Sequence, residues 1–178
     1  MVQTRHAEGQ ALIESCIVIG LICLLLMGLF QLAQLFVAQE ILDYAAGRGA
    51  RAKAVGFNDF MVYKTVQIGS IPNAGRMTFP ELPAPQTPAN QWNIERGLIP
   101  LYLHSDLYGQ LGSIMDYEDW DTIHTYCPSD QADMLHFEAI QELPIRIFSV
   151  VFRAFYADNN ITMRGSADIE NHCPLYLQ

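Results

Sequence analysis

The sequence lacks the residue patterns on which many enzyme active sites are built. It contains no G-x-S-x-G nucleophile motif, no H-E-x-x-H zinc motif, no phosphate-binding P-loop and no paired C-x-x-C. Its five histidines are scattered without metal-ligand spacing, at positions 6, 104, 124, 136 and 172. We therefore expect no catalytic residue, no metal centre and no cofactor, and the chain is predicted not to be an enzyme.

Basic residues are also scarce. Ten lysines and arginines stand against nineteen aspartates and glutamates, which gives a net charge of −9. The one basic cluster is Arg48, Arg51 and Lys53. An acidic chain without a larger basic patch is a poor binder of phosphate backbones, so nucleic acid is excluded as a partner.

The acidic residues include one dense cluster, DYEDWD at 116–121. Its carboxylates offer the oxygen ligands that calcium prefers, but the cluster lacks the glycine and the closing glutamate of an EF-hand loop. A solvated acidic turn is the favoured interpretation, and a calcium site is the alternative.

What the sequence does contain is a long uncharged run, ALIESCIVIGLICLLLMGLFQLAQLFVA at 11–38, in which Glu14 is the only charge. As a helix it would be on the order of 40 Å long, which exceeds a hydrocarbon core of ~30 Å. We predict one membrane span with some tilt or a protruding end. A buried core helix would need a larger domain than the rest of the chain supplies. A cleaved secretory signal would need a small-residue cleavage site after the run, where QEILDYAAGRGARAKAV continues instead.

Glu14 is the residue that most needs an explanation, because a carboxylate near a bilayer centre costs about 2.5 to 3.5 kcal/mol. It is the fifth residue after Gly9, which ends the short polar leader MVQTRHAEG. This arrangement resembles the type IV prepilin signature. The resemblance implies that a prepilin peptidase cuts after Gly9 on the cytoplasmic face and leaves Gln10 as the new terminus. It also implies that Glu14 neutralises the terminal amine of a neighbouring subunit during assembly.

Two features depart from that pattern. Many pilins begin the mature chain with phenylalanine, whereas Gln10 can cyclise and lose the amine charge that the pairing requires. The basic cluster follows the span, so the positive-inside rule alone would place the C-terminal region in the cytoplasm. We adopt the opposite orientation, because the resemblance implies that the cleavage site lies inside the cell.

The segment after the span, LDYAAGRGARA at 42–52, is similar to an alanine-rich "AA-R-x-G-A-R" stretch of TadE and TadG proteins. Those are minor pilin-like components of tight-adherence (Flp, type IVb) systems. Small residues let helices approach closely, so Gly47 and Gly49 are predicted to serve helix packing between subunits. The alternative is a solvated helix whose arginines contact anionic lipid. The resemblance implies as partners the prepilin peptidase, other pilin-like subunits, the Tad assembly platform and membrane lipid.

The middle of the chain predicts two further helices. Asn58 and Asp59 are cap-like residues before a helix that ends at Gly69 or Ser70, and a turn follows at 71–75. Four prolines between Pro80 and Asn90 predict an extended connector. Residues 93–104 have a helical pattern that is predicted to be kinked or stopped near Pro100.

The C-terminal third predicts an antiparallel sheet. Apolar and polar residues alternate over 161–170, which indicates a half-buried strand, and more weakly over 135–140. A third strand is expected near 120–126, because an isolated two-stranded ribbon is marginal. The apolar segment 145–156 is predicted to be a helix packed on this sheet, with the membrane surface as the alternative location. The ending ITMRGSADIE is again similar to the TadE and TadG ending, "ITLTATAVMR".

The four cysteines fall into two pairs. Cys16 and Cys23 lie in the span and are predicted to be packing residues. Cys127 and Cys173 are each followed by proline, and they are the pair available for a disulfide in an oxidising compartment. Such a bond would close a loop of about 46 residues and contribute up to roughly 4 kcal/mol in the chain-entropy model.

These patterns predict an α+β fold in three parts: a prepilin-type leader at 1–9, a transmembrane and extended helix at 10–56, and an extracytoplasmic domain at 57–178. The expected function is that of a TadE-like pseudopilin. It would lie in the inner membrane and join a type IVb pilus or secretion filament for adhesion as a minor component. The alternative is a single-pass anchored protein whose external domain binds a surface or partner and which is neither processed nor assembled.

Overall fold

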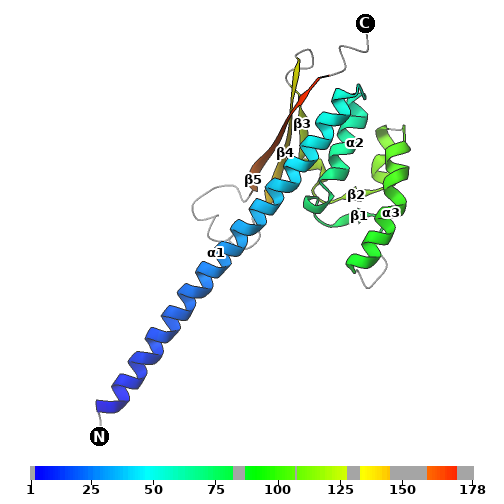
Figure 1. Cartoon of the computed structure of the whole chain (residues 1–178). Helices are drawn as coiled ribbons and strands as arrows, with labels where there is room; N and C mark the ends of the chain where they lie inside the picture. The colour runs from blue at the N-terminus through cyan, green and yellow to red at the C-terminus, as the bar shows by residue number, and fades with distance from the viewer. Residues whose placement is uncertain (1–2, 82–86, 107, 128–132, 145–159, 172–178) are drawn as a thin grey trace. The chain divides into compact units, whose positions relative to one another are not determined.

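The structure is a computed structural model that describes residues 3–81, 87–106, 108–127, 133–144 and 160–171. Its described residues fall into two compact units, which divide between Val37 and Ala38. The first contains the helix up to Val37, and the second contains the rest of that helix and every described strand. Each unit is described separately below (Figure 1).

Helix α1 covers Gln3–Ala54 without a break. In the first unit its apolar side chains are exposed, with 67% of Leu12 and 70% of Phe36 accessible. Exposing so many large apolar side chains to water costs free energy, whereas a lipid environment accommodates them. Among the described residues, one helix is long and apolar enough to cross a membrane, at Gln10–Ala54. The predicted long apolar N-terminal helix is confirmed.

The second unit begins with the end of α1, where Leu42, Ala45, Ala46 and Ala50 are buried in the core. Helix α2 covers Asp59–Gly69, and the Asn58 side chain caps it by accepting a hydrogen bond from the Met61 backbone N–H at 2.9 Å. The predicted cap and helix are therefore confirmed. The short 3₁₀ helix η1, Ile71–Asn73, follows, and Gly75 then adopts a φ of 77° that favours glycine.

Helix α3 covers Pro88–His104, so it begins before the predicted helical pattern at 93 and ends with it at 104. The extended connector does not reach Asn90, because Thr87 caps the helix and Pro88 occupies its first turn, where a missing N–H costs nothing. The helix also does not stop near Pro100, which lies inside it. Tyr102, two residues further on, is only 1% exposed. The free energy gained by burying this last turn exceeds the cost of the one backbone hydrogen bond that is lost because Pro100 has no N–H.

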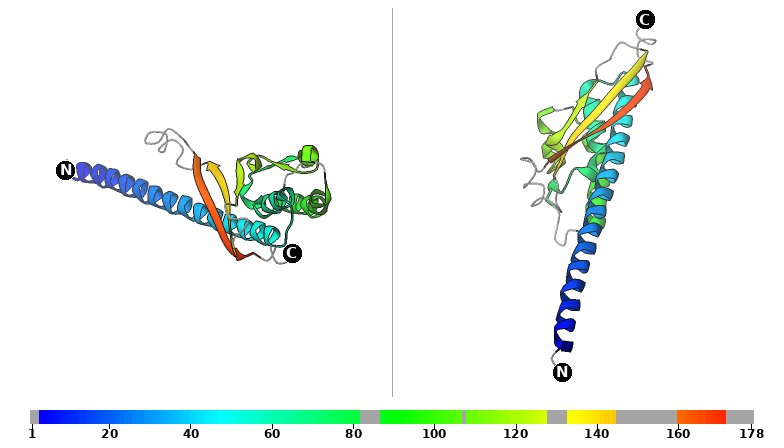
Figure 2. Two further views of the ribbon diagram at one scale, coloured as in Figure 1. Left: turned by 90° about the horizontal axis from the view of Figure 1, so that it is seen from above. Right: turned by 90° about the vertical axis from the view of Figure 1, so that its left-hand side faces the viewer.

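The three-stranded sheet has the antiparallel order β3-β4-β5, with β3 at Ile123–Tyr126, β4 at Met134–Pro144 and β5 at Asn160–Glu170. Figure 2 shows the two long strands paired side by side, in the register Phe137 to Ala167 and Ala139 to Gly165. The inward side chains of β4 are buried at every second residue, from Leu135 to Gln141. The predicted antiparallel sheet and the α+β class are confirmed.

A second, two-stranded sheet was not predicted. It pairs β1, Met77–Phe79, with β2, Asp116–Tyr117. The 3₁₀ helices η2, Tyr108–Ser113, and η3, Trp120–Thr122, flank β2. The acidic cluster is therefore more than a solvated turn, since Tyr117 and Trp120 inside it are each only 2% exposed. The helix predicted at 145–156 lies outside the described residues.

Candidate functional site

The three residues of the predicted processing and assembly signal lie on α1. Gly9, Gln10 and Glu14 all fall within the helix, and the side chains of Gln10 and Glu14 are exposed. The neighbouring Ser15 hydroxyl donates to the Ala11 carbonyl at 2.8 Å, so this polar group is satisfied inside its own helix. Within the part of the chain that the structure describes, the Glu14 carboxylate has no hydrogen-bond or ion-pair partner.

The two glycines of the alanine-rich segment have different surroundings in the structure. Gly49 faces the core, where an added Cβ would lie only 2.6 Å from both Phe137 Cε1 and Val66 Cγ2. Gly47 has nothing within 4 Å of the equivalent position. Gly49 therefore packs within its own chain, against β4 and α2, whereas Gly47 leaves open space beside α1. The predicted role of either glycine between subunits stays a prediction.

Two further glycines bring other elements against the same helix. A Cβ on Gly165 would lie 2.4 Å from the Leu42 carbonyl carbon, so β5 rests directly on the α1 backbone. A Cβ on Gly69 would lie 3.0 Å from Ala45 Cα, where α2 meets α1. Neither glycine is among the packing positions predicted from the sequence. The signal for Gly165 was present, because an isolated glycine in a strand pattern marks a close backbone approach.

Polar side chains of α1 also bind the edge strand β5. Gln39 Nε2 donates to the Arg164 carbonyl at 2.6 Å, and Asp43 Oδ1 accepts from the Ser166 N–H at 3.1 Å. These contacts satisfy backbone groups that would otherwise leave the edge of the sheet open to pairing with another chain. The end of α1 is thus an integral part of the folded unit.

A buried lysine holds the C-terminal end of α3. Lys64 on α2 donates to the Leu103 carbonyl at 2.8 Å and to the Ser105 carbonyl at 2.7 Å. A cation at the last carbonyls of a helix is favoured by the helix dipole. Burial lowers the pKa of the Lys64 ammonium, and the nearby Asp106 carboxylate opposes this shift by raising it.

A buried carboxylate lies in the same unit. Glu95 on α3 is 7% exposed, and its Oε1 accepts from the Tyr117 hydroxyl at 2.5 Å and from Gln91 Nε2 at 2.7 Å. The nearby Tyr102 hydroxyl donates to Gln67 Oε1 at 2.5 Å. Burial raises the pKa of Tyr102 well above its usual range, and burial together with the hydrogen bond to Glu95 does the same for the pKa of Tyr117.

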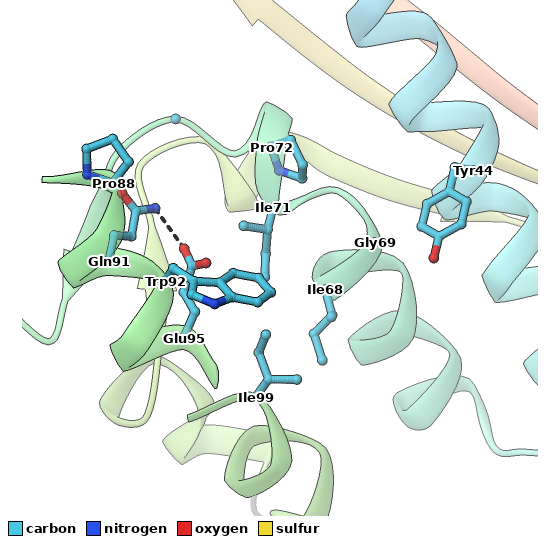
Figure 3. A pocket seen from close by; sticks show the side chains of 11 residues that line it. Tyr44, Ile68, Gly69, Ile71, Pro72, Pro88, Gln91, Trp92, Glu95 and Ile99 are labelled. Carbon is cyan, nitrogen blue, oxygen red and sulfur yellow. Dashed lines mark hydrogen bonds between the residues drawn. The ribbon is translucent and has the colours of Figure 1, made fainter. Parts of the chain in front are cut away.

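Glu95 also lines an open pocket of about 530 Å³ (Figure 3). Its walls are largely apolar and come from α1, α2, η1 and α3 within the second unit. Trp92 and Tyr44 stand at this pocket and are 62% and 61% exposed. The volume lies in the range of small-ligand sites. Nothing in the sequence patterns pointed to it, because its residues are far apart in the chain.

The remaining predicted site residues have simpler settings. Cys16 and Cys23 are exposed on α1, and Cys127 is half-buried after β3. Cys173 lies outside the described residues, so the predicted disulfide stays a prediction. Among the residues that the structure describes, no group of three or more histidine, cysteine, aspartate or glutamate side chains is arranged to hold a metal ion.

Comparison with known proteins gives one result. Neither the curated proteins nor the solved structures gave a match to this chain. A family profile described as TadE-like protein matches residues 9–51. The match begins at Gly9, includes Glu14 and the apolar run, and ends within the alanine-rich segment. The predicted resemblance is therefore confirmed, since residues 9–51 of this chain are similar to the TadE-like family.

Proposed function

We propose that this protein is a TadE-like minor pseudopilin that takes part in assembling a type IVb (Flp/Tad) pilus or secretion filament for adhesion. The observation that carries the proposal is the TadE-like match. One continuous match covers Gly9 at the end of the proposed leader, the apolar run and most of the small-residue segment. In this proposal a prepilin peptidase removes residues 1–9, residues 10–56 anchor the chain, and residues 57–178 lie outside the cytoplasm.

The state of Glu14 supports an assembly role. Its carboxylate is exposed on an otherwise uncharged helix segment and has no partner among the residues that the structure describes. A charge that is costly in lipid is retained where another molecule supplies its partner. The free amine that cleavage would create at Gln10 of a neighbouring subunit is such a partner. Filament subunits and the Tad assembly platform are the proposed protein partners, and membrane lipid is proposed to surround the apolar run of α1 at 11–38.

Processing is tested by intact mass measurement of the full chain, expressed with an active or an inactivated prepilin peptidase. The expected result is loss of the mass of residues 1–9 only with the active peptidase. A Gly9→Leu variant is the matched control and should keep the full mass. An unshortened chain in both strains would contradict the proposal. A further loss of ammonia would show that Gln10 has cyclised.

Orientation is tested on the same preparations. Protease added outside spheroplasts should degrade the region after residue 56, while protection of that region until lysis would place it in the cytoplasm. The second candidate function is a single-pass anchored adhesion protein that is not processed. The exposed pocket of the second unit favours it, since a binding surface does not require assembly. An uncleaved, correctly oriented chain would support this candidate.

A further inference from the structure

The pocket of the second unit contains the carboxyl group of Glu95, which has no cationic partner among the residues that the structure describes. Glu95 is more than nine-tenths buried and lines the pocket wall. Its two hydrogen bonds come from neutral donors, Tyr117 and Gln91, and both end on Oε1. Across the described ranges, no lysine, arginine or histidine forms an ion pair with it. A buried charge normally has an opposite charge beside it, so a ligand is one source of that charge.

The surroundings of Glu95 define the shape of such a ligand. Glu95 and Trp92 both line the pocket from α3, and in Figure 3 the side chains of Ile68, Ile71 and Ile99 lie around the end of the Trp92 indole away from the Glu95 carboxylate. An aromatic face attracts a cation, and an apolar wall suits a hydrocarbon stem. The Tyr44 ring is already covered by the Arg48 guanidinium of the same chain, with the Cζ atom 5.9 Å from the ring centre. Trp92 is the other aromatic side chain in the pocket lining, and within the described part of the chain no cation covers its ring.

We propose that this pocket binds an arginine side chain of a partner protein. A guanidinium combines the properties that the site requires, because it is planar enough to stack on Trp92 and donates paired hydrogen bonds to a carboxylate. Its three methylene groups lie along the isoleucine wall. The net charge of −9 favours the approach of a basic segment to this chain. The inference goes beyond the proposed function and does not depend on processing or filament assembly.

The test uses the full chain in detergent micelles and N-acetyl-arginine N-methylamide as the probe. Backbone amide shifts of Ile68, Gly69 and Ile71 are followed by NMR as the probe is added. We expect saturable shifts with a dissociation constant on the order of millimolar, as suits one side chain. The citrulline analogue has the same shape without the charge and should bind at least tenfold more weakly. Equal binding of the two probes, or shifts that do not saturate, would overturn the proposal.

Two variants assign the binding to this site. Glu95→Gln keeps an oxygen that accepts from Tyr117 and Gln91, and it should abolish the preference for arginine over citrulline. Trp92→Ala removes an exposed ring and should weaken arginine binding severalfold without disturbing the core. Glu142→Gln, an exposed residue of β4, removes the same charge elsewhere and should leave binding unchanged. If Glu95→Gln and Trp92→Ala left arginine binding unaltered, the site would be refuted. If a lysine analogue bound as tightly as the arginine probe, the assignment to arginine would be refuted.

Discussion

Gly49 and Gly47 lie two residues apart on α1 and have opposite surroundings. An alanine at position 47 meets open space and should stabilise the helix by up to about 1 kcal/mol. An alanine at position 49 would place a methyl group 2.6 Å from Phe137 and Val66. Overpacking of a core costs typically about 1 to 3 kcal/mol. Gly49→Ala should therefore lower the free energy of unfolding, measured by denaturant titration in micelles, while Gly47→Ala should not. Equal effects of the two variants would mean that α1 does not pack as described.

The buried tyrosines predict the behaviour of the second unit at high pH. The folded state raises the pKa of Tyr102 and Tyr117 above the usual value of about 10, so it keeps protons that the unfolded chain releases. Their contribution is fully present below about pH 10 and is lost as the pH rises beyond that value. The free energy of unfolding should thus fall above about pH 10. Tyr117→Phe should be less stable at neutral pH, because Glu95 loses a donor, but its stability should decline less steeply with pH. An identical decline in wild type and variant would exclude Tyr117 as a source.

At the scale of the element, His136 links the two long strands. Its Nδ1 lies 2.6 Å from Asp168 Oδ1 on β5, and its Nε2 lies 3.1 Å from Glu138 Oε1 on its own strand β4. The pKa of His136 is raised mainly by the hydrogen bond to Asp168 and to a smaller extent by the hydrogen bond to Glu138. A raised pKa means that this pairing stabilises the fold fully below about pH 6.5 and less as the pH rises through the folded-state value. NMR titration of the His136 ring should show a raised pKa that Asp168→Asn moves back down. A pKa that this substitution leaves in place would contradict the cross-strand contact.

Local sequence patterns predict some of the helices and strands but not others. The Asn58 cap and the alternation over 161–170 are local signals, and α2 and β5 lie where they predicted. The course of α3 past Pro100 depends on burial of Tyr102 and on Lys64 binding the last carbonyls, which join residues about 40 positions apart. The pairing of β1 with β2 also joins distant segments, and each strand is too short to show a period. The pocket around Glu95 was not predictable for the same reason, since it forms only when α2 and α3 pack.

At the scale of the whole molecule, the alanine-rich segment of α1 packs against other elements of its own chain. Gly49, Ala45 and the Leu42 backbone are contact points for β4, α2 and β5. The TadE-like match ends at residue 51, within this packing segment. The TadE-like match thus covers the apolar run of α1 and most of the α1 segment against which β4, α2 and β5 pack. Substitutions in this segment therefore test domain stability as well as assembly, and Gly47 is the position that separates the two effects.

Glu14 tests assembly without disturbing the fold, because its side chain is exposed and has no partner among the described residues. Removing the charge makes insertion easier by at most roughly 2.5 to 3.5 kcal/mol, so membrane insertion and cleavage of Glu14→Ala should be intact. If the carboxylate pairs with a terminal amine, the variant should be missing from sheared filament fractions but present in membranes. Ser15→Ala is the matched control, because that hydroxyl bonds only its own helix, and it should assemble normally. Normal assembly of Glu14→Ala would contradict the pairing. If mass measurement also showed a cyclised Gln10, the absence of an amine to pair with Glu14 would be the physical reason.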